Sequence, residues 1–131
     1  MTDSKIHIFD RATDFVVYKA GDVIFNQGDE AHSMYVIIEG EVEIDILPDL
    51  QETVDKGGFF GEMALITDDP RSATVRAKTD VKLVAVDERR FDFMVQETPG
   101  FAITIMRILV QRLRRRNQHV ADLLKQINHL Q

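Results

Sequence analysis

The sequence contains no cysteine and no tryptophan. Without thiols, the chain has no disulfide framework, no thiolate metal site and no cysteine nucleophile, which fits a reducing compartment. Long hydrophobic runs are also missing, since none approaches the ~20 apolar residues that a membrane helix needs. The N-terminus is too polar for a secretory signal. We therefore expect a soluble, cytoplasmic protein that does not associate with membranes.

The 131 residues that are present suit one globular domain, with 44% hydrophobic and 29% charged residues. The formal net charge of −6 hides an asymmetry. Residues 101–131 hold six basic residues and one acid, a net charge of +5, whereas residues 1–100 hold 10 basic and 21 acidic residues, a net charge of −11. An acidic body is thus joined to a basic tail, and partners must be considered for each separately.

Alternating apolar and acidic residues predict that the body is built from β-strands. Val42, Ile44 and Ile46 alternate with acids over residues 41–47, as in a strand that is buried on one face. Gly40 suits a tight turn before this strand. Other strand-like runs lie at 15–18, 23–25, 34–38, 72–77 and 81–86. Many short strands at close spacing predict an antiparallel sandwich or closed roll.

Helical periodicity follows the strands. Asp87 is a suitable N-cap for a short helix. The apolar face of this helix would consist of Phe91, Met94 and Val95. Thr98 followed by Pro99 predicts a second helix start, with proline at the first helical position. Nothing breaks this second helix before Gln131, and about 30 residues at ~1.5 Å each reach about 45 Å, so we expect it to project from the body.

The projecting helix has an apolar seam with heptad spacing. Its members step by three and four residues: Val110, Leu113, Asn117, Val120, Leu124 and Ile127. An overlapping set shares three of these and adds Met106, Leu109, Leu123 and Leu130. Because one small roll cannot cover so wide a stripe, we expect a homodimer through residues 103–130, with Asn117 facing its symmetry mate in a parallel pair. The alternative is that the stripe folds back on its own body.

Residues 57–75 carry the parts of a pocket for an anion that bears hydroxyl groups. A short helix after Gly61 would point N–H groups at the anion. Arg71 offers a planar donor fork for two phosphate oxygens, and Glu62 can accept hydroxyl protons, for instance from a ribose. In the alternative interpretation, Arg71 is a surface arginine paired with Asp68 or Asp69, and Glu62 is a solvated helix residue.

Residues 57–87 closely resemble the phosphate-binding cassette of the cyclic nucleotide-binding domain. The family pattern is Phe-Gly-Glu-(Leu/Met)-Ala-Leu, a short variable loop, and then Pro-Arg-(Ala/Ser/Thr)-Ala-Thr. Here the two halves stand at residues 60–65 and 70–74. The resemblance extends upstream to Ala20 and downstream to Phe91, so it covers essentially the whole body.

This domain occurs in protein kinase A regulatory subunits, cyclic-nucleotide-gated channels and bacterial catabolite activator proteins. The resemblance implies a mainly β fold with helices: a jelly-roll-like antiparallel β-roll, a short phosphate-binding helix and a long C-terminal helix. We assign residues 1–99 to the roll and 100–131 to the lid and dimerisation helix. Bacterial activators continue into a helix-turn-helix, whereas we expect a stand-alone domain here. Direct DNA binding is not expected, because the acidic body would repel phosphate.

The resemblance also assigns roles to residues. Arg71 should pair with the exocyclic phosphate, and Glu62 should bond the ribose 2′-hydroxyl. The other expected ligand-binding positions are Gly61, Met63, Ala64, Ser72 and Ala73. In the family, alanine at the position of Ser72 goes with cAMP and threonine with cGMP tolerance. Since bacterial activators with Arg-Ser-Ala use cAMP, we favour cAMP and keep cGMP as possible.

The base of the nucleotide is usually capped by the C-terminal helix. Alignment with the bacterial activators places Arg116 and Asn117 nearest the purine. Asn117 also suits the buried polar position of a coiled coil. Arg116 belongs to the cluster of residues 112–116, which is equally explained as a solvated helix face or as pairing with acids of the body.

We expect a sensor rather than an enzyme. The four histidines are too scattered for a metal site, and Glu62 has no paired base or nucleophile, so we expect no metal, no catalytic residue and no cofactor beyond a cAMP or cGMP ligand. Ligand binding should rearrange the C-terminal helix and change the surface offered to an unidentified downstream protein. The alternative is a dimerising coiled-coil adaptor whose roll binds nothing.

Overall fold

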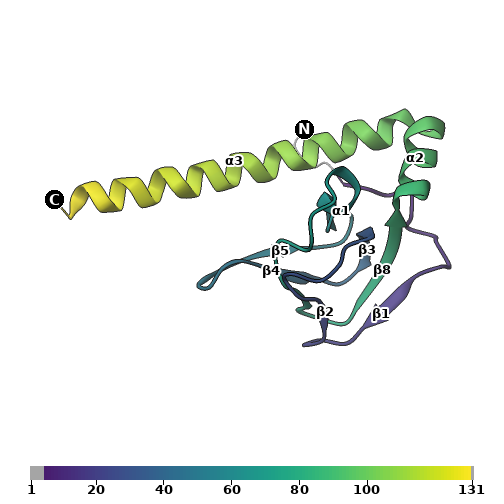
Figure 1. Ribbon diagram of the computed structural model, residues 1–131, viewed down its shortest axis with the longest axis horizontal. Helices are drawn as coiled ribbons and strands as arrows, with labels where there is room; N and C mark the ends of the chain where they lie inside the picture. Colours follow the sequence, from purple (N-terminus) through teal and green to yellow (C-terminus); the bar gives the residue numbers. More distant parts are fainter. Residues whose placement is uncertain (1–4, 131) are drawn as a thin grey trace.

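A computed structural model of the chain describes residues 5–130 and shows an antiparallel β-roll with a long helix lying across it (Figure 1). One four-stranded sheet has the order β1 (Val16–Tyr18), β8 (Val81–Asp87), β3 (Ser33–Glu39), β6 (Phe59–Phe60). The other has the order β2 (Val23–Phe25), β7 (Val75–Ala77), β4 (Val42–Leu47), β5 (Leu50–Val54). The predicted β-roll is therefore confirmed.

The predicted strands differ from the observed ones mainly in number and length. All six predicted runs contain a strand, although the run at 72–77 is shortened to β7. Two strands, β5 and β6, were not predicted. The sequence of β5, Leu-Gln-Glu-Thr-Val, shows no clear apolar alternation, and its pairing with β4 keeps it in the sheet, with Glu52 opposite Ile44 and Val54 opposite Val42.

Strands β3 and β6 are buried on both faces. Met34 and Val36 point to the cluster that packs under the helices, whereas Ile37 points to the cluster between the two sheets. Phe59 and Phe60 of β6 divide in the same way. Burial on both faces explains why these strands are continuous apolar runs, unlike the alternating β4.

Three helices accompany the roll: α1 (Met63–Ile66), α2 (Glu88–Glu97) and α3 (Pro99–His129). Asp87 caps α2 as predicted, since its carboxylate accepts a 2.8 Å hydrogen bond from the backbone N–H of Arg90. Helix α3 begins at Pro99 as predicted, but the side chain of Thr98 makes no capping hydrogen bond. No single helix within residues 5–130 is long and apolar enough to cross a membrane; α2 and α3 reach that limit only as a pair, which is bent by 113°.

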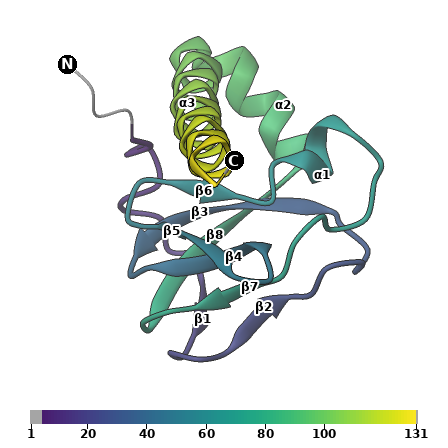
Figure 2. The same ribbon diagram turned by 90° about the vertical axis from the view of Figure 1, so that its left-hand side faces the viewer.

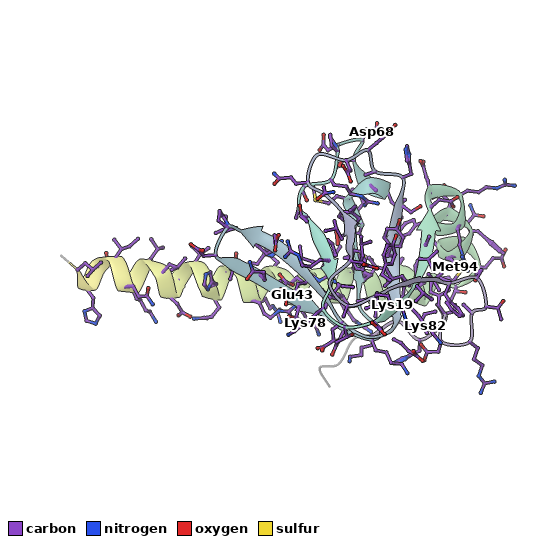
Figure 3. The ribbon with its side chains drawn as sticks, turned by 90° about the horizontal axis from the view of Figure 1, so that it is seen from below. Lys19, Glu43, Asp68, Lys78, Lys82 and Met94 are labelled. Carbon is purple, nitrogen blue, oxygen red and sulfur yellow. The ribbon has the colours of Figure 1, made fainter. Side chains whose placement is uncertain are left out.

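The two halves of α3 have different surroundings. Its buried residues are Phe101, Ile105, Ile108 and Arg112, which face the sheet that contains β3 and β6 (Figure 2). No residue described after Arg112 is buried, and this half extends beyond the roll (Figures 1 and 3). The predicted projection is therefore confirmed. The chain ends at 1–4 and 131, which the assigned domain ranges include, lie outside the described residues.

Candidate functional site

A cavity of about 450 Å³ lies between the roll and α3. Its walls come from β4, from the segments around α1 and before β7, and from α3. The seven residues predicted to bind ligand all line it: Gly61, Glu62, Met63, Ala64, Arg71, Ser72 and Ala73. Arg116, a predicted base contact, also lines the cavity, whereas Asn117 is not among its lining residues. One site therefore brings together the two halves of the cassette and the helix.

Arg71 is a buried cation without an acidic partner. Its Nη2 donates to the carbonyl of Ser33 at 2.7 Å and its Nη1 to the carbonyl of Gly61 at 3.1 Å. The guanidinium carbon lies 4.0 Å from the centroid of the Phe25 ring. Its Nε is buried and has no hydrogen-bond partner. No carboxylate within residues 5–130 forms an ion pair with it, so the predicted alternative of pairing with Asp68 or Asp69 is wrong.

Burial sets the electrostatics of Arg71. Desolvation lowers the pKa of its guanidinium, and the nearby Tyr35, Asp29 and Glu62 oppose this shift. A buried charge normally requires a partner of opposite charge. The free donor and the missing counter-charge together favour an anionic ligand at this end of the cavity.

Gly61 positions the donors of Arg71. Its φ of +77° lies in the region that glycine adopts without strain. A Cβ at this position would lie 2.7 Å from Nη1 of Arg71, so a larger residue would also displace the guanidinium. Helix α1, predicted over residues 62–66, starts one residue later at Met63 and follows this turn directly.

Arg112 is a second buried cation in the site, and it was not predicted. It extends from α3, and its Nη1 donates to Oε1 of Glu62 at 3.0 Å. Nη2 donates to the carbonyl of Phe59, and the guanidinium carbon lies 4.5 Å from the centroid of that ring. Burial lowers the pKa of Arg112, while Glu62 and Glu52 oppose the shift. Glu62, expected to meet only ribose, is thus also an anchor for the helix.

A spacing signal for Arg112 was present in the sequence. The inward residues of α3 are spaced by four, three and four: Phe101, Ile105, Ile108 and Arg112. An arginine at the end of such a row is expected to face the body. This spacing was overlooked because Arg112 also begins the run Arg-Leu-Arg-Arg-Arg, and such a run is typical of a solvated basic surface.

Glu52 of β5 contacts the arginines of α3 from the side of the roll. Its Oε2 lies 3.2 Å from Nη2 of Arg116, and its Oε1 lies 3.5 Å from Nη2 of Arg115. Nε of Arg112 is 3.9 Å from Oε1. The expectation that this cluster pairs with acids of the body is therefore confirmed for these three arginines.

The remaining walls of the cavity are apolar apart from Asp69. They include Ile44, Ile46, Ile66, Leu109 and Leu113. The hydroxyl of Ser72 donates to Sδ of Met63 at 3.8 Å. The cavity therefore offers apolar walls for a flat ring and a cationic end for an anion. Within residues 5–130, no group of three or more His, Cys, Asp or Glu side chains is arranged to hold a metal ion.

Known proteins resemble this chain in sequence and in structure. The profile of the cyclic nucleotide-binding domain matches residues 15–98. A cyclic nucleotide-gated potassium channel of Rhizobium etli is 40% identical over 96 residues, which are 73% of this chain and 27% of the channel. The chain thus spans only about a quarter of that relative.

Two solved proteins have similar folds. The catabolite activator protein of Thermus thermophilus is 29% identical with a TM-score of 0.69, covering 86% of this chain and 55% of that one. The EAL enzyme Bd1971, solved in cAMP-bound and cGMP-bound forms, is 34% identical with a TM-score of 0.58, covering 89% of this chain and 33% and 32% of the two forms. The cassette, the roll and these matches show that the chain belongs to the cyclic nucleotide-binding domain family.

Proposed function

We propose that this chain is a cyclic nucleotide sensor that binds cAMP in preference to cGMP and has no catalytic activity of its own. The observation that carries the proposal is the buried Nε of Arg71, which lacks a partner at the cationic end of a cavity of nucleotide size. The cyclic phosphate would pair with Arg71 and the ribose 2′-hydroxyl with Glu62. Residues 1–99 act as the binding roll, and residues 100–131 as lid and dimerisation helix.

The remaining cavity residues have proposed roles as well. Gly61, Ala64 and Ala73 leave room for the sugar and phosphate, and Met63 packs against the ligand. Ser72 bears on the choice of base, because a guanine amino group would have to compete with Met63 for the serine hydroxyl. Since Bd1971 has been solved with both nucleotides, we treat the choice as a ratio of affinities.

Coupling would pass through α3. A ribose at Glu62 meets a carboxylate that already accepts from Arg112, so binding changes a contact that anchors the helix. Arg116 lines the cavity and is one proposed contact of the base. Asn117 is the second proposed base contact. The ligand would shift the population of helix positions and alter the surface that a downstream protein meets in the cytoplasm.

Calorimetric titration of nucleotide-stripped protein with cAMP, cGMP and 5′-AMP tests the binding proposal. We expect about one site per chain, tighter binding of cAMP than of cGMP, and no comparable binding of the acyclic nucleotide. The variant Ser72→Ala should lower affinity for cGMP more than for cAMP, by about 1 kcal/mol, because it removes one neutral hydrogen bond. No heat with any nucleotide would instead favour a dimerising adaptor.

We also propose a homodimer through residues 103–130. The predicted seam lies on a different face of α3 from the buried residues, and its members are exposed, including Leu113 at 59%, Val120 at 53% and Leu124 at 55%. A contiguous apolar stripe of this kind normally marks an interface. Its heptad spacing suits a second copy of the same helix.

Light scattering after size exclusion tests the dimer. Leu124→Glu should convert the dimer to monomer, because it places a charge in the seam of both helices. Lys125→Glu is the matched control, since it introduces the same side chain on the next residue, outside the seam. A monomeric wild-type protein at micromolar concentration would contradict the proposal.

A further inference from the structure

Glu52 occupies an unusual position beside the cavity. It does not line the cavity, yet it forms ion pairs with three arginines of α3: Arg112, Arg115 and Arg116. Only 17% of its side chain is exposed, and Oε1 is buried without a hydrogen-bond partner. The carboxylate is therefore held near these cations by charge at short range rather than by a full set of hydrogen bonds.

These contacts lie where the apolar packing of α3 ends. The inward row of the helix stops at Arg112, and every residue described from Leu113 to Val120 is exposed. Past this point, Arg115 and Arg116 of α3 form ion pairs with Glu52 of the roll. They thus connect the roll to the part of the helix that lies beyond its buried row.

We propose that Glu52 is a positioning residue for α3: through Arg112, Arg115 and Arg116 it holds the helix over the cavity and slows the release of bound nucleotide. It does this without touching the ligand. The second part of the inference rests on the proposed function, whereas the first concerns the ligand-free protein alone.

The register of β5 against β4 determines the side of the sheet on which Glu52 lies. Glu52 pairs with Ile44 in the β4–β5 ladder, so both side chains lie on the face of the sheet that Ile44 presents to the cavity. The neighbouring acid on β4, Glu43, pairs with Thr53 and therefore points to the opposite face. Figure 3 labels Glu43 on the underside of the roll. Glu43 is thus a natural control of the same residue type.

Charge balance explains why removal of Glu52 should matter. Three guanidinium groups of α3 form ion pairs with two carboxylates, Glu52 and Glu62. Without Glu52, only Glu62 would remain, and Arg115 and Arg116 would repel Arg112 at short range, as they already do in lowering its pKa. The helix can relieve this repulsion by moving away from the roll, since no buried side chain holds it beyond Arg112.

The first test measures the position of α3 without ligand. Because the chain has no native cysteine, spin labels can be placed at Lys56→Cys on the roll and His119→Cys on the helix, both at exposed positions. Labelled protein is diluted with unlabelled protein so that only distances within one chain are seen. Glu52→Gln should broaden the distance distribution and shift it to longer values, and Glu43→Gln should not. Identical distributions for Glu52→Gln and wild type would overturn the proposal.

The second test measures release of a fluorescent cAMP analogue by stopped flow. Glu52→Gln should speed dissociation about tenfold, as expected for a partly buried ion-pair cluster, with association changed less than twofold. On an Arg115→Gln/Arg116→Gln background, the same substitution should change dissociation by less than twofold, because its main partners are gone. An equal effect on both backgrounds would show that Glu52 does not act through these arginines and would overturn the proposal.

The two tests separate the inference from the proposed function. If wild-type protein binds no cyclic nucleotide, the proposed function fails and so does the part of the inference on nucleotide release, while the distance measurement still decides whether Glu52 positions the helix. If nucleotide binds and the helix loosens in Glu52→Gln but dissociation is unchanged, Glu52 does not control release and the proposal is overturned in that respect.

Discussion

Arg71 and Arg112 are both buried and line the same cavity, but they differ in whether an acidic side chain pairs with them. Arg112, on the helix, pairs with Glu62 and lies near Glu52. Arg71, on the roll, pairs with no carboxylate and keeps its Nε without a partner. Burying a charge without a counter-charge is costly. We therefore infer that Arg112 stabilises the folded protein, whereas Arg71 binds an anionic ligand.

Substituting Arg71 should produce the largest effect on binding. Arg71→Met keeps much of the packing on Phe25 but removes the charge, so we expect cAMP affinity to fall more than about a hundredfold, or about 3 kcal/mol. Stability should change by less than about 1 kcal/mol, because the lost hydrogen bonds to two carbonyls are offset by the removal of an unpaired buried cation. Calorimetry and urea unfolding measure the two quantities.

The control for Arg71→Met is Arg76→Met, which removes an arginine of β7 that pairs with Asp45. It should leave nucleotide affinity unchanged, since Arg76 does not line the cavity. A fall in stability of several kcal/mol in Arg71→Met would contradict the contrast drawn above, because it would make Arg71 a structural residue like Arg112.

Substituting Arg112 should lower stability more than substituting Arg71 does, and should lower affinity for cAMP less. Arg112→Met leaves the Glu62 carboxylate without its ion-pair partner and the Phe59 carbonyl without its donor, so the free energy of unfolding should fall by about 2–3 kcal/mol. Affinity for cAMP should fall less than in Arg71→Met. Urea unfolding of the ligand-free protein is the measurement.

A double variant sharpens this prediction. If the loss arises from the stranded carboxylate, Arg112→Met combined with Glu62→Gln should be more stable than Arg112→Met alone, with a coupling of about 1 kcal/mol or more. Strictly additive effects would mean that Glu62 and Arg112 contribute independently to stability, and that the loss does not arise from their ion pair.

The roles of Arg71 and Glu62 could be predicted from the sequence, whereas the contacts of Arg112 and Glu52 could not. Arg71 and Glu62 belong to one contiguous pattern, in which each residue is informative through its near neighbours. Arg112 meets Glu62 across 50 positions of the chain, and Glu52 meets Arg116 across 64. Contacts at such separations depend on how α3 crosses the roll, and neither periodicity nor charge content specifies that crossing.

The fold was predictable where burial shapes the sequence strongly. Strand β4 alternates because one of its faces is buried. Residues 34–38 of β3 form a continuous apolar and aromatic run because both faces of that strand are buried. Strand β5 was not predicted because its sequence has no apolar alternation. One of its polar side chains, Glu52, forms ion pairs with α3 instead of packing in the core. The strand without a hydrophobic pattern is therefore the one that contacts the basic cluster.

Arg76 is a third arginine with an acidic partner, Asp45, and it is more exposed than Arg71 and Arg112. Its contribution to stability can be compared with theirs. Two hydrogen bonds of 2.8 Å from Arg76 lower the pKa of Asp45 from its ordinary value of 3.8, and desolvation acts in the other direction. A carboxyl group with a lowered pKa in the folded state stabilises the fold above its unfolded pKa, and this contribution is lost as the pH falls through the folded value.

Arg76→Gln should therefore lower the free energy of unfolding by less than Arg112→Met does. Since solvent screens this partly exposed pair, we expect a loss of less than about 1 kcal/mol near neutral pH. The difference from wild type should shrink as the pH falls below about 4 and through the lowered pKa of Asp45, because protonation of this carboxyl group removes the ion pair from the wild type. Urea unfolding between pH 3 and 7 tests this. A loss as large as that of Arg112→Met would mean that burial is not what separates the cavity arginines from an arginine on the surface.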